Sequence, residues 1–274
     1  MLTREELRML RWLAHEYYSG QGCICDLGAF LGGSTMALAD GLIEAGWCER
    51  RIHSYDRHRI TAAMWERYVG NRLDYPDGGD FLPLMSTLMG DRVSVVEFHS
   101  GDFLHAAVPN ESIEILFVDI AKTPETSDYL VSEFFPKLIP RCSIVVQQDY
   151  FHPWPIWDVV VMETLAEFFE PLSYTDENSA LFLCTKPIAD EAIERARVGN
   201  LTPTDARARV IDAGRRWPHT AQRLAIYNVL RLLEAEGLRP LSQRREQQAK
   251  RALQGHAFNR SEFEATFVNG TDSA

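Results

Sequence analysis

The feature that most constrains the fold is an alternation, over residues 23–186, of short apolar runs with amphipathic stretches of helical periodicity. This alternation is typical of a parallel sheet covered by helices. It predicts strands at 23–27, 51–56, 93–98, 113–119, 142–149 and 181–186, with a weaker one near 172–176. We therefore expect an α/β fold with a doubly wound, mostly parallel, seven-stranded sheet.

Helical periodicity places the covering helices between these strands. They are expected at 33–45, in parts of 59–89, at 127–138 and at 157–169. A leading helix is expected within residues 1–20, where charged and apolar residues alternate at helical spacing. The sheet and its helices would thus form one domain over residues 1–186, Rossmann-like in its alternation of strand and helix.

Beyond Pro187 the strand pattern stops, and residues 187–274 are predicted to form a helical appendage. The apolar stripe of its helix at 219–236 comprises Ile226, Val229, Leu230 and Leu233. Such a stripe is buried either against its own domain or against a second copy of the chain. A homodimer through the appendage is therefore one of two interpretations.

Charge and composition exclude several classes of partner. Residues 1–186 hold 14 Lys and Arg against 28 Asp and Glu, and an acidic domain repels a nucleic-acid backbone. No apolar run approaches the roughly 18 residues that a membrane span needs, and the N-terminus lacks the apolar core of a signal peptide. The five cysteines, an odd number, are typical of reduced core residues. We expect a cytoplasmic protein that acts neither on nucleic acid nor in a membrane.

A glycine-rich turn follows the first predicted strand. Its sequence is Asp26-Leu-Gly28-Ala-Phe30-Leu-Gly32-Gly33-Ser34, and it leads into a helix. Glycines let the backbone approach a ligand, and a helix N-terminus exposes N–H groups to it. The spacing differs from the G-x-G-x-x-G loop of dinucleotide-binding proteins, which disfavours an NAD-dependent oxidoreductase. A plain tight turn is the alternative interpretation.

Acidic residues recur at the ends of the predicted strands. Asp56 ends the second strand, Asp102 follows the third, and Asp119 ends the fourth. A carboxylate after the second strand can accept both hydroxyls of a ribose, and Asp102 could accept from an adenine amino group. Together with Asp26, these acids along one edge of the sheet predict a nucleoside-containing ligand.

These motifs resemble those of class I S-adenosylmethionine-dependent methyltransferases, over about residues 20–186. The glycine-rich turn is similar to the cofactor loop of catechol O-methyltransferases. The segments Phe117-Val-Asp119-Ile-Ala-Lys122 and Ile144-Val-Val-Gln-Gln148-Asp149-Tyr150 resemble the metal-site strands of that family and of macrocin-type sugar O-methyltransferases of antibiotic pathways. The cofactor-binding residues that the resemblance implies are Asp26, Gly28, Phe30, Gly32, Ser34, Asp56, Asp102 and Asp119.

The resemblance also implies a magnesium site held by Asp119, Gln148 and Asp149. Gln148 stands where the family has an aspartate, and a neutral amide oxygen binds Mg²⁺ less strongly than a carboxylate. The alternative is that Gln148 and Asp149 only bond to nearby loop backbone. Lys122 aligns with the general base of the catechol enzymes, and His152 is a second candidate base.

The function that follows is O-methylation of a small molecule, such as a sugar, a phenol or another secondary-metabolite hydroxyl, with S-adenosylmethionine as the cofactor and Mg²⁺ as an assisting ion. A second hypothesis is a cofactor-binding partner protein of a biosynthetic pathway, in which Gln148 marks a lost metal site. Nothing in the sequence identifies the acceptor.

Overall fold

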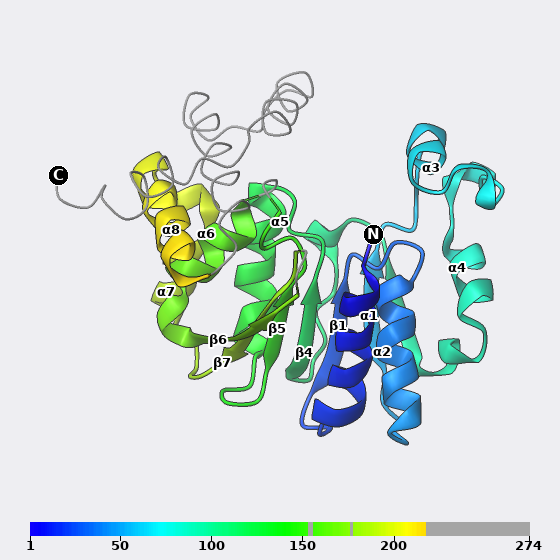
Figure 1. Cartoon of the computed structure of the whole chain (residues 1–274), viewed down its shortest axis with the longest axis horizontal. Coiled ribbons are helices and arrows are strands. Elements are labelled where there is room, and N and C mark those ends of the chain that lie inside the picture. Colours follow the sequence, from blue (N-terminus) through cyan, green and yellow to red (C-terminus); the bar gives the residue numbers. More distant parts are fainter. Residues whose placement is uncertain (153–155, 176–177, 218–274) are drawn as a thin grey trace. The chain divides into compact units, whose positions relative to one another are not determined.

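The computed structural model describes residues 1–152, 156–175 and 178–217, and contains a seven-stranded sheet in the order β3-β2-β1-β4-β5-β7-β6 (Figure 1). Strand β1 pairs in parallel with β2 and β4, and β2 with β3, whereas β6 and β7 are antiparallel. The strands are β1 (Cys23–Leu27), β2 (Ile52–Asp56), β3 (Val96–Ser100), β4 (Ile113–Val118), β5 (Ile144–Gln147), β6 (Phe169–Tyr174) and β7 (Ala180–Cys184). The predicted fold class is confirmed, including the weak strand.

The strand order reverses direction at β1. From there β2 and β3 extend to one side and β4 begins the other, so the sheet is doubly wound. In open α/β sheets, ligands bind outside the carboxyl ends of the strands at such a switch point. The segments after β1, β2 and β4 therefore occupy the position of a binding site.

The chain divides into two compact units. The first combines Met1–Ile120 with Lys137–Val146, and the second combines Ala121–Pro136 with Gln147–Ala274. Each unit draws on segments that are far apart in the sequence. The predicted division after residue 186 separates the chain differently and stays a prediction.

In the first unit, helices α1 (Arg4–Trp12) and α2 (Gly33–Glu44) lie side by side (Figure 1). Gly41 of α2 lies so close to α1 that a Cβ atom built on it would be 2.2 Å from the carbonyl oxygen of Arg11. Thr35 of α2 bonds Ser54 of β2 through its hydroxyl, at 3.1 Å. Helix α2 therefore covers the face of the sheet to which Ser54 points.

The segment before β3 is broken into short elements rather than forming one long helix. Helices α3 (Ala62–Tyr68) and α4 (Leu82–Met89) are followed by a 3₁₀ segment over Gly90–Val95. Strand β3 consequently begins at Val96, three residues later than predicted. An apolar run does not distinguish a buried turn from a strand, and Val95 is buried in the 3₁₀ segment.

In the second unit, α5 (Pro124–Tyr129) continues as a π-helical turn over Leu130–Phe134. Helix α6 (Trp157–Thr164) is shorter than predicted because Phe169 begins β6 and pairs with Cys184 of β7. Helices α7 (Asp190–Ala196) and α8 (Pro203–Arg216) begin the predicted appendage. The predicted helix at 219–236, with its dimer interpretation, lies outside the described residues.

Helix α8 is held to α6 by a charged contact. Arg216 Nη2 lies 3.1 Å from the buried carboxylate of Glu163, which also accepts a 2.7 Å hydrogen bond from the hydroxyl of Tyr150. Next to Arg216, Trp217 packs edge-on against the rings of Tyr150 and Phe151. Residues on both sides of position 186 thus share one core in the second unit.

Helix α1 begins with a capping box that supports a stability prediction. The Thr3 hydroxyl accepts from the Glu6 N–H at 3.2 Å, and the Glu6 carboxylate accepts from the Thr3 N–H at 2.8 Å. Replacing Thr3 with alanine leaves the Glu6 N–H without this acceptor and should lower the free energy of unfolding by about 1 kcal/mol. Urea denaturation measures the change. Thr3→Ser should keep the wild-type stability, and equal losses in both variants would contradict the capping role.

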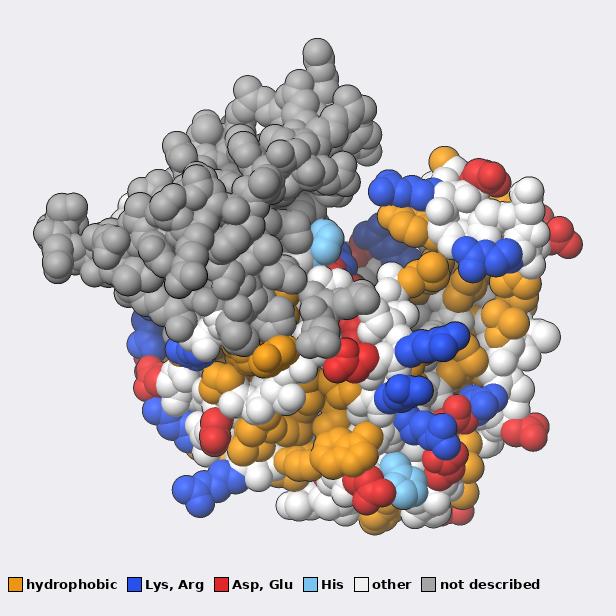
Figure 2. Space-filling model, viewed as in Figure 1, with side chains coloured by type: hydrophobic (Ala, Val, Ile, Leu, Met, Phe, Trp, Pro, Cys, Tyr) orange, Lys and Arg blue, Asp and Glu red, His pale blue; other side chains and the backbone are white. Residues whose placement is uncertain are grey.

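Within the described residues, no helix is long and apolar enough to cross a membrane. On the face of the molecule shown in Figure 2, acidic, basic and apolar side chains are interspersed.

Candidate functional site

The turn after β1 needs glycine at its first position. Gly28 has a φ of +98°, and a Cβ atom there would be 2.7 Å from the carbonyl oxygen of Asp119. Its N–H donates to the carbonyl of Tyr55 at 2.8 Å, and the Asp119 N–H donates to the carbonyl of Leu27 at 2.8 Å. The ends of β1, β2 and β4 are therefore tied together at Gly28, and no side chain would fit between them.

Phe30 joins this turn to the end of β2. Its backbone N–H donates to Oδ2 of Asp56 at 2.9 Å, while the N–H of His58 donates to Oδ1 at 2.8 Å. Phe30 has a φ of +46°, and its ring packs edge-on against Phe81. These two hydrogen bonds hold the Asp56 side chain in place. Because a carboxylate offers about four acceptor positions, two remain for the hydroxyls of a ligand.

Asp26 lies beneath the turn and is fully buried. Its Oδ2 accepts from the hydroxyls of Ser34, at 2.9 Å, and Thr35, and among the described residues its Oδ1 has no hydrogen-bond partner. Burial raises the pKa of Asp26 to about 7, although the hydroxyls of Thr35 and Ser34 act in the opposite direction. A buried oxygen without a partner is a candidate acceptor for a ligand's amino group.

Asp56 and Asp102 line one pocket of about 350 Å³ in the first unit. Its wall also includes Ser100, Phe103 and Ile120. Asp102 follows β3, accepts from the N–H of Leu104 at 3.2 Å, and lies 3.2 Å from Nη2 of Arg57. The two carboxylates that the sequence assigns to a ribose and an adenine thus face a common cavity, large enough for a small ligand.

The remaining residues of the predicted cofactor loop are also placed in the first unit. Gly32 is the N-cap of α2, and its N–H donates to the carbonyl of Ala29 at 2.8 Å. Ser34 points inward to Asp26 rather than toward the surface. Gly32 and Ser34 therefore shape the turn, and Ser34 holds Asp26.

Sequence reasoning did not single out three residues that organise this site. Thr35 shares the Asp26 carboxylate with Ser34, and Arg57 pairs with Asp102. His58 is buried, and its Nδ1 lies 2.8 Å from the hydroxyl of Ser100, which connects the ends of β2 and β3. Arg57 and His58 directly follow Asp56 in the sequence, and this position is the feature from which their role could have been predicted.

The second unit holds Lys122 and the predicted residues after β5. The ammonium of Lys122 forms an ion pair with the carboxylate of Asp149. The N–H of His152 donates to the carbonyl of Asp149 at 2.9 Å, and Gln148 is buried, with its carbonyl accepting from the Ser179 hydroxyl at 3.5 Å. Asp119 belongs to the first unit, so the metal triad and the choice of base stay predictions.

No protein-family model matches the sequence, and no curated protein is significantly similar to it. Among solved structures, the O-methyltransferase NovP is 19% identical, with a match covering 66% of this chain and 80% of that one and a TM-score of 0.47. CalS11, a TDP-rhamnose 3'-O-methyltransferase of calicheamicin biosynthesis, is 16% identical over 67% and 81%, with a TM-score of 0.49. A putative rRNA methylase from Clostridium thermocellum is 10% identical over 68% and 98%, with a TM-score of 0.41.

These structures carry the names of methyltransferases, and two of them are O-methyltransferases, the family that the sequence motifs resemble. The chain is thus a doubly wound α/β protein with a pocket, lined by Asp56 and Asp102, beyond the carboxyl ends of β2 and β3.

Proposed function

We propose that this chain is an S-adenosylmethionine-dependent methyltransferase that methylates an oxygen atom of a small molecule. The observation that carries the proposal is the pocket shared by Asp56 and Asp102 beside a glycine turn that bonds directly to Asp56. S-adenosylmethionine would supply an electrophilic methyl group on a sulfonium.

The residues of the first unit fit the three parts of this cofactor. Asp56 would accept from the ribose hydroxyls and Asp102 from the adenine amino group. The unpartnered, buried Oδ1 of Asp26 and the open backbone at Gly28 suit the amino acid portion, because a positively charged amino group would complete the bonding of that oxygen. The protein would then act mainly by holding the cofactor and the acceptor in line.

The chemistry at the acceptor is assigned to the predicted residues that follow β4 and β5. Carboxylate and amide oxygens of Asp119, Gln148 and Asp149 suit Mg²⁺, which would hold the acceptor oxygen. Lys122 or His152 would remove the acceptor's proton. The ion pair between Lys122 and Asp149 keeps a candidate base and a candidate ligand next to each other, although an ammonium must lose its proton before it can act.

The same ion pair supports the second hypothesis, a cofactor-binding partner protein. On that view the Lys122 ammonium permanently neutralises Asp149, and Gln148 has replaced a metal ligand. The two hypotheses differ in turnover. Methylation of an acceptor that requires Mg²⁺ and is lost in Asp149→Asn supports the enzyme. Tight cofactor binding without any turnover, whether or not Mg²⁺ is present, supports the partner protein.

Replacing Asp56 with asparagine should weaken binding of S-adenosylmethionine by about 100-fold. The amide keeps the shape of the side chain but loses the charge that strengthens its bonds to two hydroxyls, each worth roughly 1.5–3 kcal/mol when charged. Isothermal calorimetry with S-adenosylmethionine and S-adenosylhomocysteine measures the change.

The matched control is Asp91→Asn, the same chemical change at an exposed position of the first unit. It should leave the affinity unchanged. If the wild-type chain binds neither nucleoside, or if Asp56→Asn binds as tightly as Asp91→Asn does, the proposed cofactor is wrong.

A further inference from the structure

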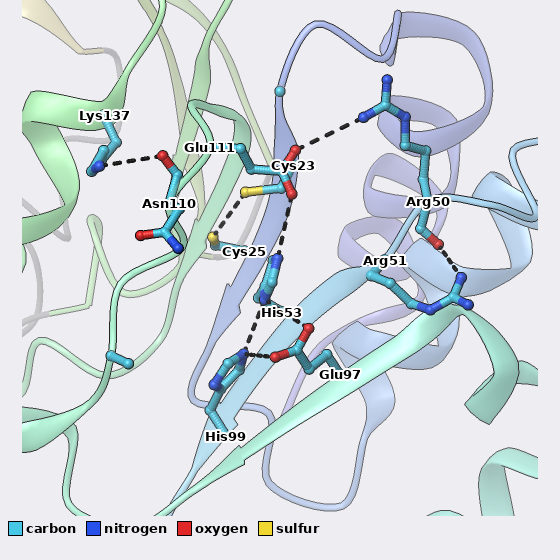
Figure 3. Close-up of polar contacts among 12 residues, drawn as sticks. Cys23, Cys25, Arg50, Arg51, His53, Glu97, His99, Asn110, Glu111 and Lys137 are labelled. Carbon is cyan, nitrogen blue, oxygen red and sulfur yellow. Dashed lines mark hydrogen bonds and ion pairs between the residues drawn. The ribbon is translucent and has the colours of Figure 1, made fainter.

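A second cluster of ligand-type side chains lies on the sheet of the first unit, beside the pocket described above, whose wall includes one member of the cluster, His99. His53 of β2 pairs in register with Glu97 of β3, and Tyr55 pairs with His99. Because side chains alternate along a strand, all four point to the same face. Ser54 points to the opposite face, which α2 covers. Parallel register therefore brings two imidazoles and a carboxylate together (Figure 3).

The distances within this cluster are close to those between ligands of a common ion. His53 Nδ1 lies 2.9 Å from His99 Nε2, and the Glu97 carboxylate oxygens lie 3.7 Å from His53 Nδ1 and 3.6 Å from His99 Nε2. Two nitrogen or oxygen ligands in a tetrahedral zinc site are about 3.3 Å apart, given bonds of roughly 2.0–2.1 Å. Shifts of about half an ångström would bring all three atoms to that spacing.

The carboxylate of Glu97 faces both imidazole nitrogens from beyond hydrogen-bond distance. Its 3.6 and 3.7 Å separations are too long for hydrogen bonds. A cation between the three groups would satisfy the carboxylate and the lone pairs of both rings at once. Without an ion, the 2.9 Å contact requires one ring nitrogen to donate to the other, and the Glu97 carboxylate makes no hydrogen bond to either.

Each ring of the cluster has a neighbour that would favour its orientation once an ion is bound. The other nitrogen of His53, Nε2, faces the carboxylate of Glu111 at 3.7 Å (Figure 3). A carboxylate on the far side of a metal-binding histidine sets its tautomer and its ring orientation. The ring of His99 stacks on Tyr55, with centroids 4.3 Å apart and planes at 10°, and the Tyr55 hydroxyl is tied to the carbonyl of Ala107 at 2.9 Å.

We propose that His53 Nδ1, His99 Nε2 and the Glu97 carboxylate form a binding site for a divalent transition-metal ion such as Zn²⁺, with an open position for water. Two imidazoles and a carboxylate are the ligand set that such ions select over Mg²⁺ or Ca²⁺. Glu97, with 55% of its side chain exposed, leaves the site accessible to an entering ion.

The other side of His53 offers a competing position. His53 Nε2, the sulfur of Cys23 and a Glu111 oxygen lie within 4.8 Å of one another. Cys23 is buried beside Cys25, with the two sulfur atoms 3.8 Å apart. The Nδ1 side is favoured because it combines two imidazoles with an exposed carboxylate, and because it leaves Glu111 as the partner of Nε2.

The test is a titration of the full-length chain, first freed of metal with a chelator, with Zn²⁺ in isothermal calorimetry and with Co²⁺ in absorption spectroscopy. One ion should bind per chain. His99→Gln and Glu97→Gln should each weaken Zn²⁺ binding by about 100-fold or more, and Glu111→Gln by about 10–100-fold because it only orients His53. Cys23→Ser should leave the affinity unchanged, and the Co²⁺ complex should show no thiolate charge-transfer band.

Three controls separate this site from others. His15→Gln removes an exposed histidine outside the cluster and should not change Zn²⁺ binding. Asp149→Asn should not change it either, which excludes the proposed magnesium site. Thermal unfolding of each metal-free variant should stay close to that of the metal-free wild type, because Glu97 is exposed and the half-buried His99 lies on the edge strand β3.

Several results would overturn the proposal. They are the absence of saturable Zn²⁺ binding, an affinity that His99→Gln and Glu97→Gln leave unchanged, and a thiolate band that Cys23→Ser abolishes, which would move the ion to the Nε2 side of His53. Because the readout is metal binding, each outcome is independent of whether the chain transfers methyl groups.

Discussion

Stability should fall by about 4 kcal/mol between pH 4 and pH 7 through a single side chain, Asp26. Burial raises its folded-state pKa to about 7, with the charges of Asp119 and Asp56 acting in the same direction. In the unfolded chain the carboxyl has its ordinary pKa near 4. Between these two values the folded state holds a proton that the unfolded state has released, so each rise in pH favours unfolding. Below and above this window the contribution is constant.

The measurement compares urea denaturation of the wild type and of Asp26→Asn across this pH range. Asparagine cannot ionise, and its amide oxygen can still accept from Ser34 and Thr35. Its stability should therefore lack the fall that Asp26 causes, and the difference between the two proteins should grow as the pH rises. Parallel curves for the wild type and the variant would show that Asp26 titrates normally.

The same residue connects stability to the proposed cofactor. A cationic amino group next to Oδ1 would favour the ionised carboxylate, since an opposite charge lowers the pKa of an acid. Saturating S-adenosylhomocysteine should then reduce the fall in wild-type stability between pH 4 and pH 7. An unchanged fall in the presence of bound S-adenosylhomocysteine would place its amino group away from Asp26.

Replacing Gly41 with alanine should destabilise the protein by about 3 kcal/mol, although helices ordinarily favour alanine over glycine. Alanine in a helix interior is favoured over glycine by about 1 kcal/mol. At Gly41, however, the added Cβ would be 2.2 Å from the carbonyl oxygen of Arg11 and 2.9 Å from the Cβ of Ala14. The obstacle is backbone, so no rotamer change relieves it, and α1 and α2 must separate.

Gly33→Ala is the matched control because Gly33 lies in the same helix and a Cβ there would meet nothing within 4 Å. It should leave the free energy of unfolding unchanged or raise it slightly. Urea denaturation and thermal unfolding of both variants measure the difference. A Gly41→Ala variant as stable as Gly33→Ala would show that the two helices are not in close contact.

The edge of the sheet could be predicted from the sequence because its signals are local. Asp56 and Asp102 follow strands whose apolar runs identify them, and parallel strands place their carboxyl ends together. The structure places both in one pocket and bonds Phe30 to Asp56. The importance of Gly28 could likewise be predicted from the sequence. Its physical reason, the backbone of Asp119 next to it, could not.

Element boundaries were less predictable where two structures compete for the same apolar residues. The run at 93–98 contains both the end of a 3₁₀ segment and the start of β3. The helix predicted at 157–169 ends early because pairing of Phe169 with Cys184 takes its last residues into the sheet. In both places long-range packing overrides a local periodicity that fits either structure.

The fold class, and the acidic residues that follow the strands of the sheet, could be predicted from the sequence alone, because each depends on spacing within short segments. The cluster of His53, Glu97 and His99 became apparent only in the folded chain. These residues occupy ordinary strand positions. His53 and Glu97, which pair in register, are 44 positions apart in the sequence. Metal sites are visible in a sequence when their ligands are close along the chain, whereas here the hydrogen-bond register of β2 and β3 brings the ligands together.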